Sequence, residues 1–306
     1  MASYKRSSMQ EKHCPICGQN NPFRVRYPER LPEEFKEFVA RGTPVHIHFR
    51  IVQCLNCGLV YSSPTIPEDQ IMDLYRHSTF IHEPQLKNML ADYVDQLKKY
   101  VPENRRGNLL EIGCSNGFFL REAQELGFKE LCGIEPNKNA LLNAPSGLTA
   151  RIVTEECKNG LFPDGYFDVV CFFQVFDHVV NPNAFLEIVR RYLKKGGLLL
   201  AIHHNILALM PRVLGSRAST YDISHMHLWD PATMRRILEK NGFKVMAIRG
   251  LASRYQLDHV ARMLPLSEGL RNGLRKTLKT LGISDATIRA SVENMVTVAC
   301  KEDSYA

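Results

Sequence analysis

One segment constrains the fold of this chain more than any other, namely residues 109–117 with the sequence LLEIGCSNG. A short apolar run ends in the acid Glu111, and a turn of small residues follows it. Residues 118–126 then form an amphipathic stretch, which Gly127 closes. This order predicts a β-strand, a nucleotide-binding turn and an α-helix, and the spacing within the turn selects among the cofactors that such a unit can hold.

The spacing of the turn fits neither of two common phosphate-binding motifs. If the dinucleotide pattern G-x-G-x-x-G starts at Gly113, its later glycines fall on Ser115 and Phe118. A Walker loop needs a Gly-Lys-Ser/Thr ending, which this turn does not have. The pattern that fits, E-x-G-x-S-x-G from Glu111 to Gly117, resembles motif I of the class I S-adenosylmethionine (SAM) methyltransferases. That motif usually has glycine where this chain has Ser115, a small residue that still lets the backbone approach a ligand. The alternative is an ordinary strand–turn–helix unit without a ligand.

A second acid lies where such a cofactor site needs one. Residues 129–134 predict another strand, and Glu135 and Pro136 follow it directly. Glu135 stands 22 residues after Gly113, about where a doubly wound fold places an acid for ribose hydroxyls. Its two oxygens can accept both hydroxyl protons of one ribose. A solvated acid at the end of a strand is the alternative.

The rest of the chain alternates strands with helices. Further strands are predicted at residues 148–154, 168–173, 198–202, 243–248 and 296–300. Asp168 opens a nearly continuous apolar run, which is typical of a strand buried on both faces of a parallel sheet. Asn181-Pro182 predicts the start of a helix that Gly196-Gly197 stops, and Asp230-Pro231 begins another. The fold class is therefore α/β, a Rossmann-like, doubly wound parallel sheet of seven strands over residues 108–306.

The later phrases of this unit fall in the order of the class I methyltransferases, which strengthens the resemblance. They read FPDGYFDVV, VFDHVVNP, LKKGGLLL and LEKNGFKV. The resemblance implies SAM as the cofactor. The residues predicted to bind it are Glu111, Gly113, Cys114, Ser115, Gly117, Glu135, Pro136 and Gln174. This family usually joins its last two strands by a short turn, so the helical insertion at about residues 251–293 is a departure. We interpret it as a substrate-side cover, with a helical pair that only stabilises the fold as the alternative.

Two C-x-x-C-G turns predict a metal site in the N-terminal part of the chain. Their thiols are Cys14, Cys17, Cys54 and Cys57, with 36 residues between the two pairs. Two such turns supply four thiolates to one tetrahedral ion, and four sulfurs leave no open position for catalysis. The prediction is a structural zinc ribbon over residues 1–66. Free thiols or two disulfides are the alternatives, and disulfides are disfavoured because no secretory segment precedes them.

A subset of methyltransferases has the same order, an N-terminal C-x2-C…C-x2-C module followed by the SAM domain, and it includes deoxysugar C-methyltransferases. Residues 57–75 (CGLVYSSPTIPEDQIMDLY) resemble its junction, and residues 222–229 (DISHMHLW) resemble its histidine-containing stretch. The resemblance implies a small-molecule acceptor such as a sugar, a nucleotide sugar or a natural-product intermediate. The sugar C-methyltransferases have a further C-terminal domain where this sequence ends, so transfer to oxygen, nitrogen or carbon stays open. Residues 67–107 are interpreted as a helical linker or lid, with an amphipathic helix at 83–101.

Histidines gather where the fold is expected to transfer the methyl group. Transfer from SAM is an in-line displacement, so the protein mainly positions the acceptor, and a base is needed only for a protonated acceptor. Histidine is the natural base near neutral pH. His178 follows the fourth strand, and His225 comes from the segment expected to fold over the same mouth. We predict His178 as the base, with His225 second, against the alternative of structurally hydrogen-bonded histidines.

Bulk properties exclude little more. The 306-residue chain carries a net charge of +7, but its basic residues are dispersed, so nucleic acid is a weaker expectation than a small molecule. An RNA-directed enzyme, or a non-catalytic module that uses the zinc ribbon to bind a partner, is the alternative function. The polar first twelve residues and the lack of a long apolar run predict a cytoplasmic protein without a membrane span. The sequence leaves the oligomeric state undetermined.

Overall fold

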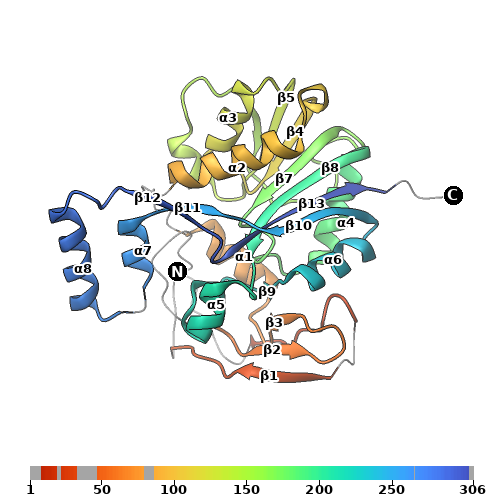
Figure 1. Cartoon of the computed structure of the whole chain (residues 1–306). Helices are drawn as coiled ribbons and strands as arrows, with labels where there is room; N and C mark the ends of the chain where they lie inside the picture. Colours follow the sequence, from red (N-terminus) through yellow and green to blue (C-terminus); the bar gives the residue numbers. More distant parts are fainter. Residues whose placement is uncertain (1–7, 19–21, 33–46, 79–85, 265, 303–306) are drawn as a thin grey trace.

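The structure is a computed structural model that describes residues 8–18, 22–32, 47–78, 86–264 and 266–302. A seven-stranded sheet forms its centre, in the order β10-β13-β8-β7-β4-β5-β6 (Figure 1). Its strands are β4 (Asn108–Ile112), β5 (Glu130–Ile134), β6 (Arg151–Val153), β7 (Phe167–Phe173), β8 (Leu193–His204), β10 (Phe243–Gly250) and β13 (Asn294–Lys301). The α/β fold and the number of strands predicted from the sequence are therefore confirmed.

The prediction of a wholly parallel sheet is wrong in one strand. β13 runs antiparallel to both of its neighbours, β8 and β10, while the other six strands are parallel. β13 lies between β8 and β10, and β10 is the strand that precedes it in the main sheet, so the chain turns back beside β10. Such a return needs no crossover helix, whereas a parallel neighbour would.

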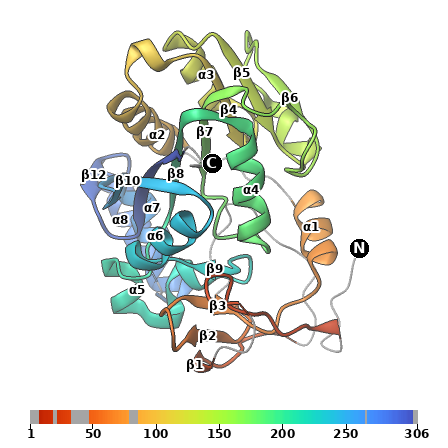
Figure 2. The same ribbon diagram turned by 90° about the vertical axis from the view of Figure 1, so that its right-hand side faces the viewer.

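Helices cover both faces of the sheet (Figure 2). α2 (Leu86–Tyr100) and α3 (Phe118–Glu125) pack on one face, and α4 (Pro182–Tyr192) and α6 (Pro231–Lys240) pack on the other. The apolar run of β7 alternates between these faces, with Val170 and Phe172 on the α4 side and Cys171 and Phe173 on the α3 side. A strand buried on both faces needs apolar residues at every position, which explains the run.

Two of these helices begin as their sequences predict. The Asp230 carboxylate accepts the backbone N–H groups of Ala232 and Thr233 at 2.8 and 2.9 Å, and the Thr233 hydroxyl accepts the N–H of Asp230. Asn181 caps α4 by accepting the N–H of Ala184 at 3.2 Å. The predicted end of α4 at Gly196 is wrong, because the helix ends at Tyr192 and the buried Leu193 already pairs with β7.

The N-terminal cysteine module shares its sheet with the rest of the molecule. Strands β1 (Phe23–Tyr27), β2 (Ile51–Cys54) and β3 (Val60–Ser62) form an antiparallel sheet, and β9 (His227–Leu228) adds a fourth strand beside β3 (Figure 2). Tyr61 of β3 also belongs to the same hydrophobic cluster as Trp229. The module is thus built onto the larger unit by main-chain pairing and by a common core.

The remaining elements are the linker helix, the insertion and several short helices. The linker forms α1 (Glu68–Arg76) before α2, and residues 79–85 between them lie outside the described residues. The insertion forms β11 (Ser253–Gln256), α7 (Leu257–Met263), α8 (Glu268–Thr280) and β12 (Thr287–Ala290). Its Arg254 binds Asp92 and Asp95 of α2, with nearest guanidinium–carboxylate distances of 2.5 and 2.6 Å. The shorter helices are α5 (Leu209–Leu214), η2 (Glu103–Arg105), η3 (Lys138–Asn143), η4 (Gly215–Arg217) and η5 (Ser219–Tyr221).

Candidate cofactor and methyl-transfer site

The turn between β4 and α3 has the backbone that its glycines predict. Gly113 and Gly117 adopt φ values of +74° and +81°. A Cβ atom on Gly113 would lie 2.5 Å from a methyl carbon of Val175, and one on Gly117 would lie 2.6 Å from a methyl carbon of Leu148. Both positions therefore need glycine for conformation and for space.

Ser115 takes the same left-handed conformation without being glycine. Its φ is +53°, a backbone state that costs a residue with a side chain about 1–3 kcal/mol. Its N–H donates to a carboxylate oxygen of Glu135 at 2.9 Å, which holds the turn in place. Its hydroxyl is buried without a hydrogen-bond partner. A strained turn with an unsatisfied hydroxyl fits a site that receives a polar ligand.

Glu135 is fully buried and binds main-chain groups on two sides. One oxygen accepts the N–H of Ser115, and the other accepts the N–H of Asn137 at 2.8 Å. The Tyr75 hydroxyl of α1 lies 3.4 Å from the second oxygen, and the Asn137 side chain donates to the carbonyl of Tyr75 at 3.2 Å. Glu135 thus connects the turn to the loop after β5, and the linker helix lies over both.

The remaining residues predicted for the cofactor lie on the same edge. Glu111 and Cys114 are buried beside the turn, and Pro136 is half-buried next to Glu135. Burial raises the pKa of the Cys114 thiol well above its ordinary value, so this residue offers its main chain rather than a thiolate.

Gln174, which follows β7, has a φ of +55°, donates its side-chain NH2 to Asn294 at 3.1 Å, and has a buried carbonyl oxygen without a partner. Within the described residues, Ser115 and Gln174 are the two non-glycine positions with positive φ.

Three histidines cluster at this edge. His225 lies between His178 and His204, with its ring centre 4.7 Å from that of each. His178 follows β7, His204 ends β8, and His225 precedes β9, so three separate segments bring them together. His203 instead points into the sheet and contacts the Thr297 hydroxyl at 2.9 Å. His227 turns to the carbonyl of Val179 at 3.0 Å.

An acid that the sequence analysis missed binds this cluster. Asp177 is fully buried, and one of its oxygens accepts both the backbone N–H of His204 at 3.0 Å and its ring Nδ1–H at 2.9 Å. Glu293, just before β13, has a carboxylate oxygen 3.6 Å from Nε2 of His204. Asp177 directly precedes His178, a predicted base, at the end of a buried strand. This position could have identified Asp177 from the sequence. Glu293 carried no signal because its partner lies far away in the sequence.

The three histidines differ in their electrostatics. Burial lowers the pKa of His178, and burial together with the neighbouring imidazoles lowers the pKa of His225 well below its ordinary value. Burial acts in the same direction on His204, but the hydrogen bond and charge of Asp177 outweigh it and raise the pKa of His204. The same contact, helped by the other histidines, holds the pKa of Asp177 well below its usual range although burial opposes this.

The four predicted metal ligands converge. All four cysteine sulfurs lie within 4.8 Å of one another, with Cys14–Cys57 and Cys17–Cys54 separations of 3.4 and 3.9 Å. A tetrahedral zinc with Zn–S bonds of about 2.3 Å places its sulfurs about 3.8 Å apart. The N–H groups of Gly18 and Gly58 close each turn on the carbonyls of Cys14 and Cys54. The donor set and its spacing therefore fit a zinc ion.

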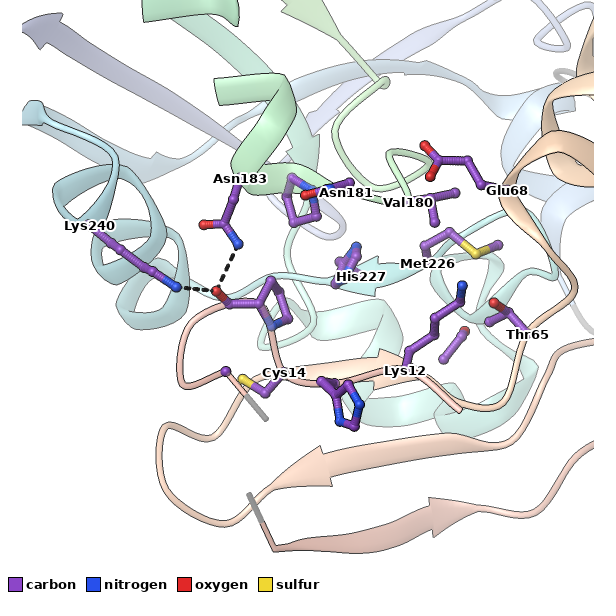
Figure 3. A pocket seen from close by; sticks show the side chains of 15 residues that line it. Lys12, Cys14, Thr65, Glu68, Val180, Asn181, Asn183, Met226, His227 and Lys240 are labelled. Atoms are coloured by element: carbon purple, nitrogen blue, oxygen red, sulfur yellow. Dashed lines mark hydrogen bonds between the residues drawn. The ribbon is translucent and has the colours of Figure 1, made fainter. Parts of the chain in front are cut away.

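A cavity of about 480 Å³ separates the first cysteine turn from the start of α4 (Figure 3). The side chains of Asn183 and Lys240 close one side of it by donating to the carbonyl of Pro15 at 2.9 and 2.6 Å. Lys12, Glu68 and His227 also line it, while residues 111–117 and 135 do not. These contacts attach the cysteine turn to α4 and α6, so the cavity marks the seam between the module and the larger unit.

Together the strand order, the strained turn and the buried acid after β5 define a SAM-binding α/β fold. Residues 75–248, more than half of the chain, match the model of a protein family described as "Methyltransferase domain". The chain belongs to this family, and the domain that it carries is that of a SAM-dependent methyltransferase.

Similar proteins agree with this assignment. The chain is 24% identical over 166 residues to a mitochondrial ubiquinone biosynthesis O-methyltransferase of Dictyostelium discoideum and 26% identical over 179 residues to the human protein of that name. These matches cover 47% and 51% of this chain, and 52% and 48% of the relatives, so the chain spans about half the length of the curated relatives it matches.

Solved structures share the fold. A putative methyltransferase of Bacillus halodurans, 17% identical, superposes with a TM-score of 0.50 over 69% of this chain and 99% of its own. The [4+2]-cyclase SpnF, 18% identical, has a TM-score of 0.50 over 71% of this chain and 82% of its own. Among the described residues, no helix is both long enough and apolar enough to cross a membrane.

Proposed function

We propose that this chain transfers a methyl group from SAM to a hydroxyl group of a small molecule. The observation that carries the proposal is that the strained turn at Ser115 and the cluster of His178, His204 and His225 occupy the same edge of the sheet. The names of the curated relatives favour oxygen as the acceptor atom. The resemblance of the junction and of the histidine segment to the zinc-containing sugar C-methyltransferases favours a sugar, a nucleotide sugar or a natural-product intermediate as the acceptor class.

In this proposal SAM supplies a methyl group on a sulfonium centre, and the protein supplies position and a base. Gly113, Cys114 and Gly117 offer close main-chain approach, while Glu135 stands at the position for ribose. Because Glu135 is covered by Tyr75, binding of the ribose requires the Tyr75 hydroxyl to move aside. The histidine cluster takes the proton that a hydroxyl acceptor loses. His178 and His225 are the sequence-based candidates for that role.

Calorimetry with SAM and with its demethylated product S-adenosylhomocysteine tests the cofactor part. We expect Glu135→Ala to weaken binding by roughly ten- to hundredfold, because charge-assisted hydrogen bonds contribute about 1.5–3 kcal/mol. Glu122→Ala, which removes an exposed acid of α3, is the matched control. Failure of the wild type to bind either compound would contradict the proposal.

The acceptor is sought by methyl uptake from labelled SAM into panels of sugars, nucleotide sugars and phenols, with RNA as a separate arm. Uptake into a small molecule supports the proposal. Uptake into RNA, with binding that weakens steeply as salt rises, would favour the RNA-directed alternative.

We also propose that Cys14, Cys17, Cys54 and Cys57 hold a structural zinc ion. Metal analysis should then find about one zinc per chain. The double substitution Cys17→Ser and Cys54→Ser should remove the metal and lower the unfolding temperature, whereas Cys300→Ser, outside the cluster, should keep it. If the purified wild type contains no metal and still unfolds in one cooperative transition, zinc has no structural role.

A further inference from the structure

We infer that His204, oriented by the buried carboxylate of Asp177, is the residue that accepts the proton of the hydroxyl acceptor, in place of His178 or His225. This inference rests on the proposed function, and it deepens that function by assigning the base and a positioning residue. Both residues lie at the strand ends where the sequence predicts methyl transfer, but neither was predicted as a catalytic residue.

The Asp177 carboxylate fixes the orientation of the His204 ring. Its Oδ2 accepts two hydrogen bonds from one residue, the backbone N–H and the ring Nδ1–H of His204. The ring is therefore fixed in orientation, and with the proton on Nδ1 the lone pair lies on Nε2. The main-chain carbonyl of Asp177 accepts the N–H groups of Met226 and His227 at 2.7 and 3.2 Å. Asp177 thus ties the end of β8 and the segment before β9 to the loop after β7.

The three histidines differ in the partner that each ring has on Nδ1. His178 and His225 donate Nδ1–H to the main-chain carbonyls of Ser224 and Thr220 at 3.0 and 2.9 Å. A carbonyl is a neutral dipole, so it stabilises a protonated ring less than a carboxylate does. When a histidine takes a proton, its charge must be stabilised where it forms. Within the cluster, His204 is the ring that has a carboxylate on Nδ1 to do this.

The charges around His204 favour its protonated form. The titratable groups that face it come from four elements: Asp177 and His178 after β7, His203 within β8, Asp222 and His225 before β9, and Glu293 before β13. Burial acts to lower the pKa of His204, but the three carboxylates together raise it. The pKa of His203 falls to about 4 because it is buried, so that neighbour stays neutral near pH 7. His204 is thus the strongest base of the cluster.

The side chain of His204 is partly exposed. His204 keeps about 15% of its side chain exposed, whereas His225 is nearly fully buried. Glu293 lies 3.6 Å from Nε2, and its own carboxylate accepts the Ser219 hydroxyl. Nε2 of His204 therefore faces a polar neighbour, the partly exposed Glu293 carboxylate, rather than apolar side chains.

The step balances without a further reactant. The acceptor oxygen forms a bond to the methyl carbon as the sulfur–methyl bond breaks, and the electron pair of that bond stays on sulfur, which becomes a neutral thioether. The hydroxyl proton passes to Nε2 of His204, and Asp177 stabilises the resulting imidazolium. The proton then leaves to solvent when the product departs.

The test begins with the ligand-free protein. Histidine labelled with 13C at Cε1 is titrated by NMR, and His204→Gln identifies the resonance of His204. We expect His204 to titrate above pH 6.5 in the wild type. In Asp177→Asn, we expect its pKa to fall by roughly 1–3 units, because the opposite charge is lost. Asp285→Asn, at an exposed position of the insertion, makes the same change in charge and should leave the resonance unmoved.

The second readout is the pH dependence of kcat/KM for methyl transfer, using the acceptor found by methyl uptake. The inference is supported if kcat/KM rises with pH around a midpoint above 6.5 and this midpoint falls in Asp177→Asn. A midpoint below 6.5 assigns the base to His178 or His225 instead. His204→Gln should reduce transfer by about 10²–10⁴-fold while SAM binding persists. If Asp177→Asn does not fold, the wild-type titration and the wild-type midpoint still decide the question. If the protein binds SAM but methyl transfer does not depend on His204, this inference alone is overturned. If the protein does not bind SAM, the proposed function is overturned.

Discussion

Two buried carboxylates at the same edge of the sheet serve different purposes. Glu135, after β5, accepts the main-chain N–H groups of Ser115 and Asn137, so it fixes the shape of a loop. Asp177, after β7, accepts the ring N–H of His204, so it sets the charge of a side chain. Both are fully shielded from solvent, and burial alone does not distinguish them. The identity of the donor decides whether a buried acid builds a binding surface or tunes a base.

The largest expected effect comes from removing the acid that faces a histidine. Asp177→Ala removes the buried carboxylate that binds Nδ1 of His204 and leaves Glu293 as the nearest acid, 3.6 Å from Nε2. Breaking a buried pair of this kind costs about 3–5 kcal/mol of unfolding free energy. Urea unfolding measures the loss, with Asp285→Ala as the control at an exposed acid. A loss below about 1 kcal/mol would mean that the two acids do not differ as described.

The pH dependence of that loss sharpens the comparison. The pKa of Asp177 is lowered on folding, so its stabilisation is present above its unfolded value of about 3.9 and is lost as pH falls. The pKa of His204 is raised, so its stabilisation is full below its unfolded value of about 6.5 and is lost as pH rises through the folded value. The destabilisation by Asp177→Asn should therefore be greatest between about pH 4 and 6.5. Unfolding curves of wild type and variant across pH 4–9 measure it, and a flat difference would exclude a charged pair.

A smaller effect is expected at the acid that faces amides. Glu135→Gln keeps one acceptor oxygen for two main-chain N–H groups, so one buried donor loses its partner at a cost of about 1–3 kcal/mol. The amide NMR signals of Ser115 and Asn137 should shift in this variant, while the His204 ring signal should not. Coupled movement of both sets of signals would show that the two loops form one unit.

The smallest effect is expected at Tyr75, whose hydroxyl lies over Glu135. Tyr75→Phe removes a hydroxyl whose contact with the carboxylate is long, 3.4 Å, so the unfolding free energy should change by less than about 1 kcal/mol. If the hydroxyl must move aside for the ribose, SAM should bind this variant at least as tightly as the wild type. Calorimetry compares the two proteins, and weaker binding would instead make Tyr75 a contact of the cofactor.

Local patterns were sufficient to predict much of this molecule. Three features can be recognised from residues close together in the sequence: the glycines of the turn, the paired cysteines and the apolar runs of the strands. The structure confirms the strands and turns that they predict. Asp177 and His204 are 27 residues apart, and their contact depends on two neighbouring strands ending at the same level. β9 is two residues long and carries no strand pattern of its own, so its pairing with β3 was invisible. The direction of β13 likewise depends on its pairing with β10 and β8, which its composition does not reveal.

The pairing of β9 with β3 connects the cysteine cluster to the segment that carries His225. Cys54 ends β2, β2 pairs with β3, and Ser62 of β3 donates its hydroxyl to the carbonyl of His225 at 2.9 Å and its N–H to that of Met226. Two ladders of main-chain hydrogen bonds thus join the thiols to the segment that carries His225. We therefore expect a reagent that oxidises those thiols to disturb the proposed methyl-transfer site through the backbone, at a distance from the reacting atoms.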